Sequence, residues 1–91
     1  MAVPTVQIDD DRAIVTEWLF APGAATGWHR HQHDYIVVPL ADGVLRIEGV
    51  DGEIVEANLR HGVSYSRPAG VEHNVFNAND CEFAFIEIEL R

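Results

Sequence analysis

The chain has 91 residues and a mass of 10.1 kDa, which leaves room for a single domain. Six arginines and no lysines stand against 15 acidic residues, so the formal net charge is −9. This balance argues against a nucleic-acid partner or an anionic membrane surface, because both require clustered basic side chains. Hydrophobic residues make up 47% of the chain, so the charge does not imply disorder.

The compartment is predicted from features that the sequence lacks. No stretch of about 18 apolar residues is present, and such a stretch is needed to span a membrane. The first residues, Met1 to Thr5, lack the basic start and apolar core of a secretory signal. The one cysteine, Cys81, has no partner for an internal disulfide. We therefore expect a cytoplasmic protein that does not associate with membranes.

The small size of the chain predicts an additional source of stability. A domain of this length buries only about 60–70% of its unfolded surface, so a metal ion or a partner subunit is expected. We divide the chain into an N-terminal segment, residues 1–12, and a β domain, residues 13–91. Because exposed strand edges must be covered, we expect a homodimer in which Thr5 to Ile8 pairs with a neighbour.

In chain order, short apolar or alternating runs are separated by turn signals about every ten residues. This pattern is typical of an all-β sandwich or barrel. The dipeptides Asp42-Gly43 and Asp51-Gly52 are both hairpin signals. About eight short strands are predicted, within residues 13–20, 28–31, 35–40, 44–48, 53–59, 63–67, 75–76 and 82–90.

Three of the five histidines lie close together in the chain. On an extended strand, His29, His31 and His33 share one face with Tyr35. Two imidazoles at positions i and i+2 bind one cation when a third ligand comes from elsewhere, and His73 is the candidate. For His33 three roles stay open, namely metal ligand, hydrogen-bond partner near the site, or surface residue.

The sequence also predicts the positions of three other polar residues. His61, beside Gly62, is predicted to be a solvated turn residue. Arg67 comes just before Pro68, near the expected mouth of the barrel, and is a candidate contact for a substrate. Arg30 lies between two candidate ligands and is expected to point away from them.

The second half of the chain carries a spaced motif that resembles the cupin family. The family pattern G-x5-P-x-G-x2-H-x3-N is matched at every fixed position, by Gly62, Pro68, Gly70, His73 and Asn77. At average Gly and Pro usage, the first three positions alone match by chance roughly twice in ten thousand starts.

The first cupin motif is matched in part. Gly23, His29 and His31 fit G-x5-H-x-H, but the glutamate that follows in the family falls here at Tyr35 or Ile36. The resemblance covers about residues 13 to 90. More narrowly, stretches such as Gly27-Trp28-His29-Arg30-His31 look like small bacterial cupins associated with β-alanine degradation.

The resemblance implies a single-domain cupin-type antiparallel β-barrel, or jelly roll. It also implies a divalent metal ion held by His29, His31 and His73. Fe²⁺ is favoured, because a three-histidine site resembles that of the cupin dioxygenases, with Zn²⁺, Ni²⁺, Mn²⁺ or Cu²⁺ as alternatives. Tyr35 replaces the glutamate and is the candidate catalytic residue, although it could equally hydrogen-bond a ligand or pack.

Three functions are compatible with the implied fold and histidine site. The first is a non-haem dioxygenase, or a related enzyme, that acts on a small carbonyl or carboxylate substrate. The alternative is a non-catalytic cupin that binds or senses a small molecule, since fold alone does not decide function. The third is a metal-free barrel with vestigial histidines.

Overall fold

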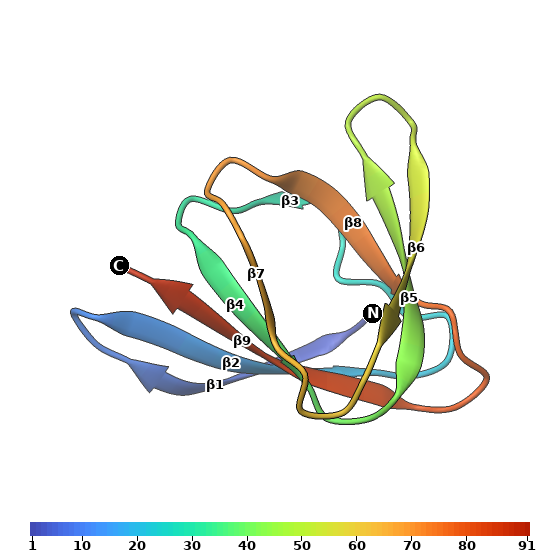
Figure 1. Cartoon of the computed structure of the whole chain (residues 1–91), viewed down its shortest axis with the longest axis horizontal. Helices are drawn as coiled ribbons and strands as arrows, with labels where there is room; N and C mark the ends of the chain where they lie inside the picture. The colour runs from blue at the N-terminus through green and yellow to red at the C-terminus, as the bar shows by residue number, and fades with distance from the viewer.

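The computed structural model describes all 91 residues of the chain. It contains nine β-strands, which form two antiparallel sheets (Figure 1). No helix is present that is long and apolar enough to cross a membrane. The strands are β1 (Val3–Asp9), β2 (Ala13–Phe20), β3 (His29–Arg30), β4 (Tyr35–Pro39), β5 (Gly43–Gly49), β6 (Ile54–Leu59), β7 (Tyr65–Arg67), β8 (Glu72–Asn77) and β9 (Phe83–Leu90).

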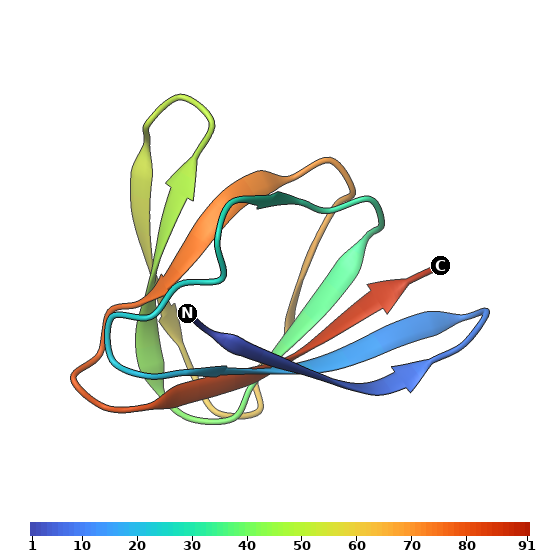
Figure 2. The ribbon, with the colours of Figure 1, turned by 180° about the vertical axis from the view of Figure 1, so that it is seen from behind.

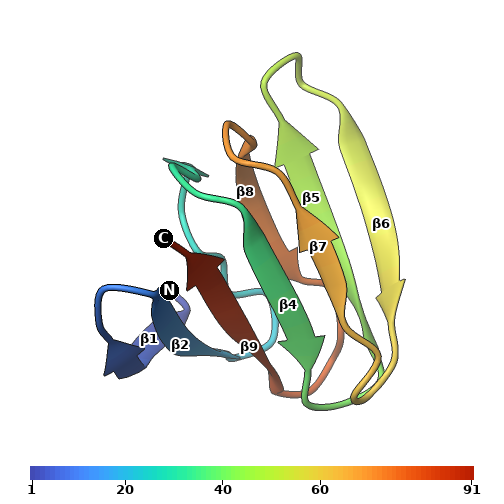
Figure 3. The ribbon, with the colours of Figure 1, turned by 60° about the vertical axis from the view of Figure 1, so that its left-hand side comes forward.

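The two sheets curve around a shared interior. One sheet has five strands in the order β1-β2-β9-β4-β7, and the other has four in the order β3-β8-β5-β6. Figure 2 shows the short β3 beside β8, and Figure 3 shows β4 between β9 and β7. The β5–β6 hairpin projects beyond the rest of the molecule (Figure 1). The predicted all-β cupin-type fold is confirmed.

Each of the eight predicted runs overlaps one strand, and β1 is the ninth strand. β1 pairs with β2 of its own chain, with Val3 opposite Leu19 and an irregularity between Val6 and Ile8. Its other edge has no partner within the chain. Pairing of this segment with a neighbouring molecule therefore stays a prediction that concerns the free edge.

The two hairpin predictions have different outcomes. Asp51-Gly52 closes the β5–β6 hairpin, and Gly52 has a positive φ of 74°. Asp42-Gly43 was wrongly predicted as a hairpin, because β4 and β5 belong to different sheets. A Cβ at Gly43 would lie 2.7 Å from the Phe83 ring, so glycine is required there by close packing.

The side of the five-stranded sheet that faces the interior is set by alternation along its strands. Phe20, Tyr35, Val37 and Phe85 point inward and are buried, and the rings of Phe20 and Phe85 lie 5.4 Å apart. Their neighbours in sequence point outward. The core consists of Ala2, Phe20, Tyr35, Val37, Leu45, Leu59, Val75, Phe83 and Phe85.

Asn77, the last residue of the second motif, ties three segments together. Its side chain is 2% exposed and donates to the carbonyls of Phe20, Ala21 and Cys81. Its side-chain oxygen accepts from the backbone and the side chain of Asn79. Asn77 thereby closes the turn after β8 and also anchors the end of β2.

We predict that Asn77→Ala destabilises the protein by about 3 kcal/mol, because several buried polar groups lose their partner at once. Urea denaturation followed by tryptophan fluorescence measures this change. Asn58→Ala, at an exposed position on β6, is the matched control and should cost less than about 0.5 kcal/mol. Equal losses in the two variants would contradict the assigned role.

Candidate metal centre

Three histidine side chains meet where β3 lies against β8. His29 on β3 is directly opposite His73 on β8. The pairing continues past β3, because the His31 amide donates to Val71 and the Gly70 amide donates to His31. Gly70 has a φ of +94°, which turns the chain from β7 into β8. The two motifs are thereby held against each other by backbone hydrogen bonds.

The imidazole nitrogens of these residues converge. Nε2 of His31 lies 3.0 Å from Nε2 of His29 and 3.1 Å from Nε2 of His73. The three rings meet edge to face, with centroids 4.7 to 5.1 Å apart. Nδ1 of His29 lies 2.9 Å from the carbonyl of Gly27, so donation by Nδ1–H to that oxygen leaves Nε2 free as a ligand.

This spacing fits a shared divalent ion. Two nitrogen ligands about 2.1 Å from one ion lie about 3.0 Å apart at a right angle and about 3.4 Å apart at the tetrahedral angle. The Nε2–Nε2 separations of 3.0 and 3.1 Å match the right angle. The predicted ligands His29, His31 and His73 are therefore brought together as one group that could hold a metal.

The protonation of the group also suits a metal. Burial and, to a smaller extent, the nearby His29 together lower the pKa of His31 and of His73 to about 4. At neutral pH both rings are therefore neutral and carry a free lone pair. Metal binding requires this neutral form of imidazole.

Tyr35 lies next to the histidines, as its position in the sequence predicted. Its ring stacks on that of His31, with centroids 3.8 Å apart. Burial raises the pKa of Tyr35 above its ordinary value, and Tyr65 and Glu87 raise it further. The phenol consequently keeps its proton at neutral pH and is a hydrogen-bond donor.

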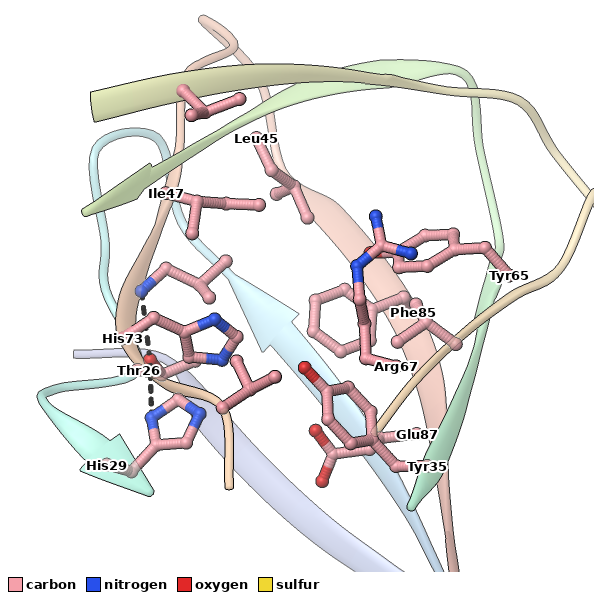
Figure 4. A pocket seen from close by; sticks show the side chains of 14 residues that line it. Thr26, His29, Tyr35, Leu45, Ile47, Tyr65, Arg67, His73, Phe85 and Glu87 are labelled. Atoms are coloured by element: carbon pink, nitrogen blue, oxygen red, sulfur yellow. Dashed lines mark hydrogen bonds between the residues drawn. The ribbon is translucent and has the colours of Figure 1, made fainter. Parts of the chain in front are cut away.

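A cavity of about 280 Å³ opens beside the histidines (Figure 4). His29, His73 and Thr26 lie on one side of it, and Tyr35, Glu87, Arg67 and Tyr65 lie on the other. Most of the remaining lining is aliphatic or aromatic. The cavity is thus an apolar space with polar groups on both sides of it.

Arg67 reaches this cavity from β7. Its guanidinium lies 4.6 Å from the centre of the Tyr65 ring and donates to the carbonyl of Ser66. No carboxylate lies within ion-pair distance of it, although three other arginines in the chain have such partners. Arg67 is therefore a free positive charge on the cavity wall.

Glu87 lines the cavity but belongs to neither sequence motif, and it was not predicted as a site residue. It is 9% exposed and belongs to a second group with His31 and Glu89, whose ligand atoms lie within 4.8 Å of one another. Burial raises the pKa of Glu87 to about 7, and Glu89 contributes to this rise. The available signal was its alternation with Phe83 and Phe85, which share its face of β9.

The other polar residues lie away from the centre. His33 belongs to neither candidate metal group, because the strand ends at Arg30 and the following residues bend. Arg30 is exposed and does not line the cavity, as predicted. His61 is exposed in the turn before β7, also as predicted.

Two antiparallel sheets around a convergent histidine group define a cupin. A family model described as "Cupin domain" matches residues 16–89, and the chain belongs to this family. Over 90 residues it is 58% identical to the beta-alanine degradation protein BauB of Pseudomonas aeruginosa, covering 99% of this chain and 94% of that protein. The predicted resemblance is thus confirmed.

Solved structures agree on the fold. A cupin domain from Bordetella pertussis superposes with a TM-score of 0.95 and 58% identity, covering 99% of this chain and 93% of that one. A double-stranded β-helix domain protein from Klebsiella pneumoniae has a TM-score of 0.79 at 19% identity, covering 98% and 76%. At that lower identity, the likeness shows the fold alone.

We predict that the metal-free protein loses stability on mild acidification. Below pH 6.5 the histidines of the unfolded chain take up protons that folded His31 and His73 accept only near pH 4. The unfolded state binds more protons in this range, so the free energy of unfolding decreases as the pH falls from 6.5 to 4. Thermal denaturation of EDTA-treated protein at a series of pH values measures this dependence.

Two variants separate the contributions. His73→Asn should make the pH dependence shallower, whereas His61→Asn, at an exposed position, should leave it unchanged. Glu87 acts in the opposite direction, since its pKa of about 7 in the folded protein lies above the ordinary glutamate value of 4.5. Its stabilising contribution is lost as the pH rises from 4.5 to 7, so Glu87→Gln should raise the melting temperature at pH 8. An unchanged pH dependence in both His73→Asn and Glu87→Gln would contradict the assignment.

Proposed function

We propose that this protein is a mononuclear metal-dependent cupin enzyme that acts on a small substrate bearing a carbonyl or carboxylate group. The observation that carries the proposal is the convergence of three imidazoles beside an apolar cavity whose lining also includes Tyr35, Arg67 and Glu87. A dioxygenase reaction is the form we favour, in which O₂ is the oxidant and both of its atoms enter the product.

His29, His31 and His73 are the proposed ligands of a divalent ion. The nitrogen separations of 3.0 and 3.1 Å suit ligands at right angles, as on one face of an octahedron, better than tetrahedral ones. This supports Fe²⁺, whose oxygenase sites use three facial protein ligands and keep open positions, over tetrahedral Zn²⁺. Such an ion supplies a Lewis acid and, as Fe²⁺, an electron donor for O₂.

The cavity suits a short substrate with two polar ends. Its volume of about 280 Å³ lies just below the range of about 300–1,000 Å³ for ligand pockets, so the substrate is small. The unpaired Arg67 would bind an anionic end, because a guanidinium pairs well with carboxylate. Tyr35 would donate its phenol proton in a hydrogen bond to the substrate near the metal end.

The relative named for β-alanine degradation supports this choice of substrate. β-Alanine is a three-carbon carboxylate with a second polar group at its far end, which matches a cavity with two polar ends. We propose that this protein acts in the same degradation. The substrates to test are three-carbon carboxylates that carry an amino, hydroxyl or carbonyl group on the third carbon.

Metal binding is predicted to depend on the histidine group. The protein reconstituted with Fe²⁺ without oxygen should hold about one ion per chain, and His73→Ala should hold less than about one-tenth, because two imidazoles seldom suffice for tight binding. Elemental analysis after desalting measures the content. His61→Ala is the matched control. Equal metal content in His73→Ala and the unmodified protein would exclude this site.

Tyr35 and Arg67 are predicted to affect different kinetic constants. With Fe²⁺-loaded protein and the three-carbon panel, O₂ uptake and ¹⁸O incorporation report turnover. Tyr35→Phe should lower kcat about 10- to 100-fold with full metal content, since a hydrogen bond at the reacting end is lost. Arg67→Gln should raise KM about five- to tenfold, and Arg30→Gln should change neither constant.

The same experiment distinguishes the enzyme from the non-catalytic alternative. If the metal-loaded protein binds these carboxylates by calorimetry but consumes no O₂ and forms no product, the protein is a binding or sensing cupin. If it neither binds nor turns over any member of the panel, the proposed substrate class is wrong. Full turnover in both Tyr35→Phe and Arg67→Gln would show that neither side chain has a part in the reaction.

A further inference from the structure

Two charged side chains of opposite sign line the cavity. Of the 6 basic and 15 acidic residues in the sequence, Arg67 on β7 and Glu87 on β9 are the two that do so. They do not pair with each other, because the three ion pairs of the chain involve other residues. An apolar cavity that holds two separate and opposite charges is matched by a ligand that carries both kinds of charge.

The register of the five-stranded sheet sets how the two charges lie. β4 lies between β7 and β9, and its residue Val37 is opposite Tyr65 on one side and Glu87 on the other. The guanidinium of Arg67 lies 4.6 Å from the centre of the Tyr65 ring. The two charges therefore lie at the same level of the sheet, on the inner side that Val37 shares. Two strand spacings, or about 10 Å, separate the backbones of β7 and β9.

A short amino acid spans this distance. A three-carbon chain with an amine at one end and a carboxylate at the other is about 5 Å long. A charge-assisted hydrogen bond at each end adds about 2.8 Å, which gives a total of about 10–11 Å. Figure 4 shows the Arg67 guanidinium and the Glu87 carboxylate at different parts of the cavity wall.

The exposure of the two residues gives the ligand an orientation. Arg67 is exposed, whereas Glu87 is 9% exposed and belongs to the group that contains His31 and Glu89. A carboxylate at Arg67 would thus lie at the mouth of the cavity, and the amine would lie further in, beside the histidines. Because Glu89 adds a second carboxyl near Glu87, this inner position favours a cationic group.

We propose that Glu87 is a specificity residue that selects substrates with a protonated amine, and that the ligand is a short amino-acid zwitterion held between Arg67 and Glu87. This inference rests on the proposed function, which leaves an amino, hydroxyl or carbonyl group open on the third carbon of the substrate. An ammonium group offers the Glu87 carboxylate both hydrogen bonds and an opposite charge, whereas a hydroxyl or carbonyl group offers no charge. The carbon that carries the amine is then the one nearest to the histidines.

Calorimetry with β-alanine and 3-hydroxypropionate tests this selection, because the two probes have the same length and differ in one end group. It is carried out at pH 8, above the pKa of about 7 of Glu87. The unmodified protein should bind β-alanine at least about tenfold more tightly than 3-hydroxypropionate. Glu87→Gln should weaken β-alanine binding about tenfold and change 3-hydroxypropionate binding less than about threefold, so that the preference disappears. Arg67→Gln should weaken both probes about equally, since both carry the carboxylate.

Glu82→Gln is the matched control, because Glu82 is exposed just before β9 and does not line the cavity. It should keep the preference for β-alanine. Thermal denaturation verifies that each variant is folded. The titrations use EDTA-treated protein and are repeated with Zn²⁺-loaded protein, since Zn²⁺ has no redox chemistry.

The outcomes separate this inference from the proposed function. Equal binding of the two probes to the unmodified protein, or an equal loss of both in Glu87→Gln, would overturn the inference alone. A lower metal content in Glu87→Gln would assign the carboxyl to the metal and would also overturn it. If neither probe binds to either form of the protein, the inference and the proposed substrate class are both wrong.

Discussion

The register of β3 against β8 is the constraint on which the site depends. β3 has only two residues, yet it sets His29 directly opposite His73 and carries His31 into the same group. A shift of one residue would turn His29 to the other side of the sheet, since side chains alternate. Hydrogen bonds on both sides of β3 hold this register. After β3, the backbone of His31 pairs with Val71 and Gly70, and before β3 the Gly27 amide donates to the side chain of Asn74. Asn77 fixes the far end of β8.

Two buried imidazoles and a partly buried third, with nitrogen separations of 3.0 and 3.1 Å from His31, are costly for a protein of this size without an ion. A hydrogen bond between two rings satisfies one pair of nitrogens at most, and protonation is opposed by burial and by the neighbouring rings. A cation in the centre would turn three competing lone pairs into ligands. Because binding to the folded state alone adds to stability, the same group that destabilises the metal-free chain would stabilise the loaded one. This answers the need for added stability that the short chain implied.

The sequence predicted what depends on spacing and alternation, and missed what depends on the pairing of distant strands. Gly62 to Asn77 and the pair His29 and His31 belong to motifs with fixed spacing, so the ligand group was found without coordinates. Asp42-Gly43 has the composition of a hairpin turn, but β4 pairs with β9 and β7 instead, a choice made by long-range packing around Phe83. Glu87 lies 14 residues beyond His73 and outside both motifs, and it reaches the cavity only because β9 lies beside β4.

The orientation of β9 links the cavity to the outer side of the five-stranded sheet. Its two sets of alternating residues are Phe83, Phe85, Glu87 and Glu89 on one side and Ala84, Ile86, Ile88 and Leu90 on the other. Burial of apolar side chains alone would favour the second set as the core, yet the first set faces inward. The aromatic rings fill the interior beside the cavity, and Glu87 places a carboxyl on its wall. The cost is a row of aliphatic side chains left on the outer surface, which a monomer has no element to cover. Polar groups on the inner wall and aliphatic side chains on the outer side of the sheet are, on this reasoning, two consequences of one choice of face.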